Sequence, residues 1–154
     1  MTILFLRHAE SIFNVDNNNK LKNCSITKKG IEQSKKIEID IYFDLVICSP
    51  LKRTIQTLEY SNIKYKKIIY NKLFREFKTD ICDFFEDEEI IYENEEDILN
   101  RINECKILLN KLKIEFKNIL IIGHADFFWY LSSEISDNER FGTWLDNCEI
   151  INFN

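Results

Sequence analysis

Histidine is rare in this sequence, and the positions of its two histidines suggest chemistry. The chain has 154 residues, and each histidine directly follows an apolar run, ILFLR before His8 and ILIIG before His124. Arg7 adjoins the first histidine, and Arg53 lies in the segment SPLKRT that follows a further apolar run. Arginine binds phosphoryl oxygens through paired hydrogen bonds, and an imidazole can accept the group as a nucleophile. These residue types in this arrangement indicate phosphoryl chemistry.

A plainer interpretation of the same residues has to be weighed. A single histidine after a strand is more often a packed or capping residue than a catalytic one, and Arg53 alone could be a solvated helix residue. Two features favour a shared site. Both histidines occupy the same kind of position, and arginine is scarce, with 5 Arg against 16 Lys. An arginine in this chain is therefore of interest for its planar fork rather than for charge alone.

The elements that would position these residues alternate along the chain. Short apolar runs predict strands buried on both faces, and amphipathic stretches predict helices between them. The strands are expected at 2–6, 44–48, 67–70, 118–122 and 149–153, and the helices at 28–40, 51–60, 97–116 and 125–134. This order predicts one α/β domain over 1–154, with a mostly parallel central sheet flanked by helices. Ligands of such sheets bind beyond the carboxyl ends of the strands, where both histidines fall.

Composition excludes several classes of protein. A hydrophobic content of 45% excludes a disordered chain, and a net charge of −5 argues against a nucleic-acid or membrane binder. Five cysteines without a C-x-x-C pair argue against a structural zinc site, and their odd number fits reduced thiols. The first residues do not resemble a signal peptide, and no run approaches the roughly 20 apolar residues of a membrane span. We expect a cytoplasmic protein without metal or cofactor.

Six short motifs, in the correct order, resemble those of the histidine phosphatase superfamily, which has the phosphoglycerate mutase-like fold. LRHAES with the asparagine three residues on is similar to the family's Arg-His-Gly-Glu-Ser/Thr-x-x-Asn signature. CSPLKRTIQT is similar to its Ser-Pro-x-x-Arg-Ala/Thr-x-x-Thr motif. The matching segments are 6–14, 27–33, 48–57, 73–76, 123–124 and 147–150. The resemblance spans nearly the whole chain, because the segments are spread from residue 6 to residue 150.

The resemblance implies a role for each matching residue of the phosphate site. His8 would be the nucleophile that forms a phosphohistidine. Arg7, Arg53 and His124 would bind the phosphoryl oxygens and stabilise the group in transfer. Asn14 would help to position the phosphate or the substrate. These roles agree with the reading from the residues alone, since developing phosphoryl charge requires preorganised donors.

The resemblance also implies a general acid, which it places at Glu76. This carboxyl group would protonate the leaving oxygen and then activate water, which requires a raised pKa. A salt-bridged surface carboxylate is the plain alternative. Glu10 and Asp126 are rival acids, because both lie next to the proposed catalytic histidines. Asp126 departs from the family, which usually has a small residue there, as Ala9 departs from the family's glycine.

The activity expected from this resemblance is hydrolysis of phosphomonoesters through a phosphohistidine on His8. A phosphoglycerate mutase, a protein phosphohistidine phosphatase and a non-catalytic phosphate-binding module are the alternatives. The partner would be a small phosphorylated substrate or a phosphoprotein. The segment 71–95, which builds a lid in larger members, is short here, so we expect an open site. This argues against a mutase, which must exclude water.

Two features outside the motifs have ordinary explanations. Eight carboxylates without a basic residue lie in 86–97, and the simplest interpretation is a solvated loop and helix start rather than a docking rim. The rest of the chain then carries a net positive charge, which permits a local basic pocket. Trp129 and Trp144 are expected in the core rather than as stacking platforms.

Overall fold

A five-stranded sheet runs through the middle of the computed structural model, which describes residues 1–153. The strand order is β3-β2-β4-β1-β7, in which the first four strands are parallel and β7 is antiparallel to β1. The strands are β1 (Thr2–Arg7), β2 (Tyr42–Cys48), β3 (Lys64–Tyr70), β4 (Asn118–Gly123) and β7 (Ile150–Asn152). The expected mostly parallel α/β sheet is confirmed.

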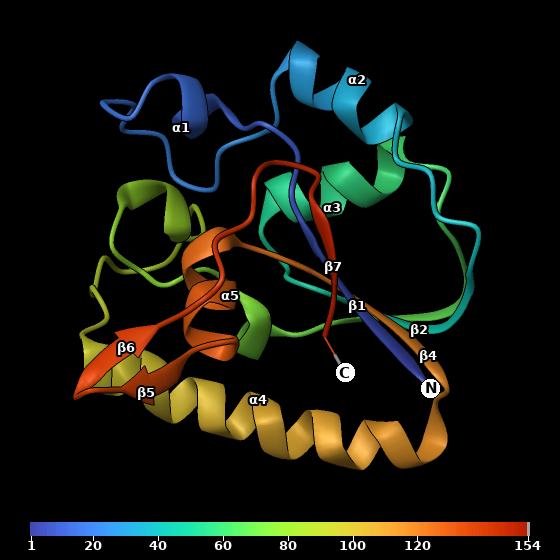
Figure 1. Ribbon diagram of the computed structural model, residues 1–154. Helices are drawn as coiled ribbons and strands as arrows, with labels where there is room; N and C mark the ends of the chain where they lie inside the picture. Colours follow the sequence, from blue (N-terminus) through green and yellow to red (C-terminus); the bar gives the residue numbers. More distant parts are fainter. Residues whose placement is uncertain (154) are drawn as a thin grey trace.

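Helices cover both faces of this sheet (Figure 1). On one face lie α2 (Lys28–Lys35) and α3 (Lys52–Tyr60), and on the other α4 (Glu95–Glu115) and α5 (Ala125–Leu131). Successive side chains of β1 alternate between the two cores. Ile3 and Phe5 belong to the core under α4 and α5, whereas Leu4 and Leu6 contact the other. The central strands are therefore buried on both faces, as their continuous apolar runs predict. No helix within residues 1–153 is long and apolar enough to cross a membrane.

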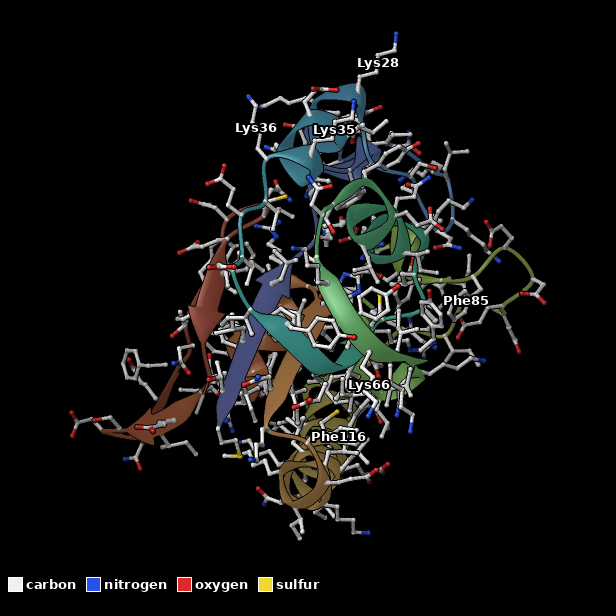
Figure 2. All side chains as sticks on the ribbon, turned by 90° about the vertical axis from the view of Figure 1, so that its right-hand side faces the viewer. Lys28, Lys35, Lys36, Lys66, Phe85 and Phe116 are labelled. Carbon is white, nitrogen blue, oxygen red and sulfur yellow. The ribbon has the colours of Figure 1, made fainter. Side chains whose placement is uncertain are left out.

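The helix predicted over 28–40 is too long, because α2 ends at Lys35. Thr27 caps its start as expected, accepting a hydrogen bond from the Gly30 amide at 3.0 Å. Beyond Lys36 the apolar residues fall at 37, 39 and 41, which is the period of an extended chain, and these isoleucines pack on the second core. The lysines of α2 point outward into solvent (Figure 2).

Two further elements differ from expectation near the carboxyl end. The helix predicted over 125–134 ends at Leu131, because Glu134 already begins a hairpin. This hairpin pairs β5 (Glu134–Ser136) with β6 (Glu139–Phe141) through Asp137 and Asn138, whose φ angles are 52° and 65°. Two left-handed residues of this type form the tight turn that matches strand twist.

Most of the acidic run is exposed, as expected for a solvated loop and helix start, but several of its carboxylates form ion pairs. Glu86 pairs with Lys52 at 2.9 Å, Glu88 with Lys78 at 2.6 Å, and Glu93 with Arg101 at 2.7 Å. The segment 71–95 holds two short 3-10 helices, η1 (Lys72–Phe74) and η2 (Ile81–Asp83), which these contacts fasten to the main body. It is therefore a packed structural segment.

Candidate active site

The pairing of two parallel strands brings the histidines together. Arg7, the last residue of β1, is the register partner of Gly123, the last residue of β4. His8 and His124 therefore leave neighbouring strands at the same edge. Their ring centroids are 5.2 Å apart with the planes inclined at 57°, and both side chains are buried. The predicted convergence of the two histidines is thus observed in the geometry.

The His8 ring is held in one tautomer. Its Nδ1 lies 2.7 Å from the carbonyl oxygen of Ala9, which can only accept, so Nδ1 carries the hydrogen and Nε2 the lone pair. Burial lowers the pKa of His8 well below its ordinary value, and the charges of Arg53 and Arg7 lower it further. His8 is consequently a neutral imidazole with a free nucleophilic nitrogen.

Whereas His8 is held through its Nδ1, His124 is held through its Nε2. Its Nε2 lies 2.7 Å from Oγ of Ser49, the residue that follows β2. Its Nδ1 is buried without a hydrogen-bond partner among residues 1–153. Burial and the charge of Arg53 lower the pKa of His124 well below the ordinary value. If Ser49 donates to Nε2, the hydrogen of His124 sits on Nδ1, where it can meet a phosphoryl oxygen.

Arg7 is a buried cation with spare donors. Its Nη1 donates to the carbonyl oxygen of Leu145 at 2.6 Å, and its guanidinium lies 5.4 Å from the ring centroid of Trp144. Its Nε is buried without a partner among the described residues. Trp144 is 53% exposed and lines the cavity, so the expectation of a core position is wrong for this residue.

Arg53, in the first turn of α3, is oriented by a residue that the sequence did not reveal. Its Nη2 donates to the Asp83 carboxylate at 2.9 Å, and its Nη1 donates to the carbonyl oxygen of Cys82 at 3.0 Å. Both charged side chains are buried, and Asp83 raises the pKa of Arg53 although burial alone would lower it. Asp83 lies in η2, within an irregular segment whose pattern gave no signal.

Glu76 lies across the cavity from the basic residues and is 8% exposed. Its Oε1 accepts hydrogen bonds from the backbone amides of Phe127 at 2.8 Å and Phe77 at 2.9 Å. The first of these is an otherwise unsatisfied donor in the first turn of α5, so Glu76 caps that helix. Burial raises the pKa of Glu76 to about 8, with the charges of Asp126 and Asp83 adding to the effect. Burial therefore favours the protonated form of this carboxyl group.

The two rival acids lie in different places. The Glu10 carboxylate accepts hydrogen bonds from Lys29 at 2.9 Å and Thr27 at 2.8 Å, which lower its pKa, and Glu10 does not line the cavity. Asp126 does line it, in the first turn of α5. Of the three carboxyl groups considered, only Glu76 and Asp126 share the cavity with His8.

Asn14 also lines the cavity, with its side chain used partly for structure. Its Oδ1 accepts hydrogen bonds from the Ser11 amide and hydroxyl, both at 3.0 Å, at the start of α1 (Ile12–Val15). The same oxygen accepts from Nδ2 of Asn147 at 3.2 Å. The side-chain Nδ2 of Asn14 makes no hydrogen bond with any residue of 1–153, so it is the part available to a substrate.

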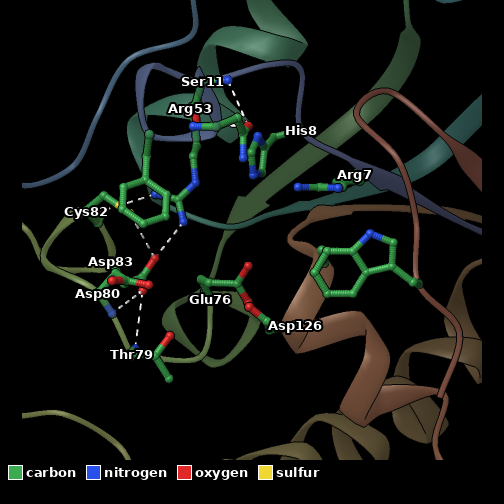
Figure 3. A pocket seen from close by; sticks show the side chains of 14 residues that line it. Arg7, His8, Ser11, Arg53, Glu76, Thr79, Asp80, Cys82, Asp83 and Asp126 are labelled. Carbon is green, nitrogen blue, oxygen red and sulfur yellow. Dashed lines mark hydrogen bonds and ion pairs between the residues drawn. The ribbon is translucent and has the colours of Figure 1, made fainter. Parts of the chain in front are cut away.

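The residues converge on a cavity of about 170 Å³. Figure 3 shows Arg7, His8 and Arg53 on one side of it and Glu76, Asp126 and Asp83 on the other. We call Arg7, His8 and Arg53 the basic half, together with His124, which packs against His8 and does not itself line the cavity. We call Glu76, Asp80, Asp83 and Asp126 the acidic half. The segment 71–95 supplies much of the acidic half, so it forms a wall of the cavity although it is short. The arrangement can hold an anion against His8 with an acid opposite.

The family model of the histidine phosphatase superfamily (branch 1) matches residues 3–108. The chain belongs to this superfamily. No curated protein sequence matches the chain significantly.

Solved structures show the same fold at low sequence identity. The phosphoglycerate mutase of Thermus thermophilus is 14% identical with a TM-score of 0.65, and the match covers 99% of this chain and 92% of that one. The alpha-ribazole phosphatase of Shigella flexneri is 18% identical with a TM-score of 0.63, covering 94% and 96%. A phosphoserine phosphatase mutant of Entamoeba histolytica, in complex with phosphoserine, is 15% identical with a TM-score of 0.59, covering 99% and 90%.

Proposed function

We propose that this protein is a phosphatase that hydrolyses phosphomonoesters through a phosphohistidine on His8. One observation carries the proposal. A buried histidine with a free Nε2 and the buried carboxyl group of Glu76, whose pKa is raised by burial, face one cavity that also holds two buried arginines. A nucleophile, an acid and a set of phosphoryl-binding cations are the groups that such a transfer requires.

In the first half-reaction, Nε2 of His8 attacks phosphorus and the bond from phosphorus to the ester oxygen breaks. The Glu76 carboxyl group gives its proton to the departing alkoxide, which leaves as an alcohol. Arg7, Arg53 and His124 meet the charge on the phosphoryl oxygens. Asn14 contributes its amide nitrogen to the phosphate or substrate. Because Asp83 holds Arg53 in place, the guanidinium needs little reorganisation during transfer.

In the second half-reaction, the Glu76 carboxylate takes a proton from water as the water oxygen attacks phosphorus. The bond from phosphorus to Nε2 of His8 breaks, which releases inorganic phosphate and restores the neutral imidazole. Glu76 is again protonated, so the cycle closes without a cofactor or metal. The raised pKa of Glu76 suits both roles, since acid and base strength are then balanced near the working pH.

Two other activities use the same groups. A phosphoglycerate mutase would return the phosphoryl group to a second hydroxyl of the substrate instead of to water. A protein phosphohistidine phosphatase would take it from a nitrogen, for which protonation of the leaving group is also needed. The short segment 71–95 favours hydrolysis, because it adds a wall but no long lid above the cavity.

The test is hydrolysis of p-nitrophenyl phosphate by the wild type and by His8→Ala. We expect turnover by the wild type and a loss of at least about 10³-fold in the variant, as for removal of other covalent nucleophiles. Equal, negligible rates in both would support a phosphate-binding module instead. Conversion of 3-phosphoglycerate to its isomer faster than phosphate release would support the mutase.

A further inference from the structure

We propose that the substrate is a compact phosphomonoester that carries its own ammonium group, which Asp126 binds while His8 and the arginines hold the phosphate. This inference rests on the proposed function, and it names a substrate class for the same site. It starts from the uneven charge of the cavity. The basic half and the acidic half face each other across a space of about 170 Å³, which suits a small molecule.

The carboxylates of the acidic half are not equivalent. Asp83 is neutralised by its buried ion pair with Arg53, and burial favours the protonated form of Glu76. Asp126 accepts no hydrogen bond and forms no ion pair within residues 1–153, although it is only partly exposed and lines the cavity. Burial raises the pKa of Asp126, and the charge of Arg7 acts on this carboxyl group without forming an ion pair with it, so the ionised form of Asp126 is incompletely stabilised by the groups of the cavity.

The basic half also contains a buried polar atom without a hydrogen-bond partner among the described residues. Arg7 is nine-tenths buried, and its Nε has no partner among the described residues. Figure 3 shows its guanidinium directed into the space beside His8, with Glu76 and Asp126 opposite. The phosphate of a substrate would take up the charge of Arg7 that now acts on Asp126, and Asp126 would then need another cation.

A phosphate ester without a positive charge would pair with Arg7 but not with Asp126. Its two negative charges would be met by Arg7 alone, because the charge of Arg53 is already balanced by Asp83, and Asp126 and the exposed Asp80 add further negative charge. A substrate ammonium group offsets this repulsion and forms a charge-assisted hydrogen bond with Asp126. Arg7, His8 and Asp126 line the same cavity of about 170 Å³, so a short spacer between phosphate and nitrogen fits it.

The first measurement compares O-phosphoethanolamine with n-propyl phosphate, in which a methyl group replaces the ammonium. We expect the wild type to prefer the amino substrate in kcat/KM by about tenfold or more, the usual effect of one hydrogen bond to a charged group. Asp126→Asn should reduce this preference about tenfold, and Asp126→Glu should retain much of it. The matched control is Asp137→Asn, which removes an equal charge at the β5–β6 turn and should keep the wild-type preference.

The second measurement separates binding from chemistry and needs no variant. The phosphonates 3-aminopropylphosphonate and butylphosphonate have the same lengths as the two substrates, and their inhibition constants against p-nitrophenyl phosphate should differ in the same direction. Equal inhibition constants in the wild type would overturn the proposal. So would an equal loss on both substrates in Asp126→Asn, which would mean that Asp126 acts on Glu76 alone. Absence of hydrolysis of every ester would instead refute the proposed phosphatase activity.

Discussion

The two halves of the cavity are built in different ways. Each member of the basic half comes from a strand end or the first turn of the helix that follows it. Arg7 ends β1 and His8 follows it, Arg53 lies in the first turn of α3 after β2, and His124 follows β4. Most of the acidic half comes from the irregular segment between β3 and α4, with Asp126 added by α5. The sheet register places the backbone of the basic half, whereas the acidic half depends on how a loop packs.

This difference assigns separate tasks to the halves. In the proposed mechanism, the basic half supplies the nucleophile and the charges that hold a phosphoryl group. The acidic half sets protonation and orientation, since Glu76 holds a proton and Asp83 holds Arg53. Substitutions in the acidic half should therefore change pH dependence, leaving-group dependence or stability, as the following variants test.

The largest effect is expected for Glu76→Gln. Loss of the acid should lower the rate on an alkyl phosphate by about 10²- to 10⁴-fold, and much less on p-nitrophenyl phosphate, whose leaving group needs no proton. In the wild type, kcat/KM should fall above a pH of about 8 as Glu76 ionises, and the variant should lack this decline. Equal losses on both esters would remove Glu76 from the role of acid.

Glu76→Gln should also change the pH dependence of stability. In the folded protein the pKa of Glu76 is raised to about 8, from an ordinary value of 4.5. The stabilisation that protonated Glu76 contributes is complete below a pH of 4.5 and declines as the pH rises toward about 8. The variant should therefore gain in Tm relative to the wild type between those pH values. A constant difference in Tm across this range would contradict the assignment.

A second large effect is expected for Asp83→Asn, measured as stability. Removing one partner of a buried ion pair costs about 3–5 kcal/mol, because the remaining charge stays buried. Inorganic phosphate should raise the Tm of this variant more than that of the wild type, since the anion can neutralise Arg53. An unchanged Tm without phosphate would show that the Arg53–Asp83 pair contributes little to folding.

The smallest effect is expected for Glu10→Gln. Glu10 follows His8 closely in sequence, but its carboxylate bonds to Lys29 and Thr27 rather than lining the cavity. The rate on either ester should change by less than about twofold, as for a surface pair of small energetic weight. A loss comparable to that of Glu76→Gln would reverse the order of the candidate acids.

The same contrast explains how much the sequence could predict. His8 and His124 could be placed because each directly follows a continuous apolar run, and parallel strands end at one edge. Asp83 could not, because its importance comes from the packing of η2 against Arg53, and no local pattern encodes that contact. Glu76 was reached only through the family resemblance, and its capping of α5 was not foreseen.

The fold shows the same division. The strand runs were found with small errors at their ends, since buried β-strands have a clear apolar signal. The helix predicted over 28–40 was extended across isoleucines 37, 39 and 41, whose spacing of two indicates an extended chain. The β5–β6 hairpin was missed although Asp137 and Asn138 are typical of its turn.

The central claim is that His8 carries the phosphoryl group, and the most direct measurement is to trap it. Glu76→Gln should accept a phosphoryl group from p-nitrophenyl phosphate and release it slowly, because the base that activates water is absent. Alkaline quenching followed by peptide mass spectrometry should locate an acid-labile phosphoryl group on His8, and His8→Ala/Glu76→Gln should carry none. Hydrolysis by the wild type, with no phosphoryl group on His8 or with one on another residue, would contradict the account.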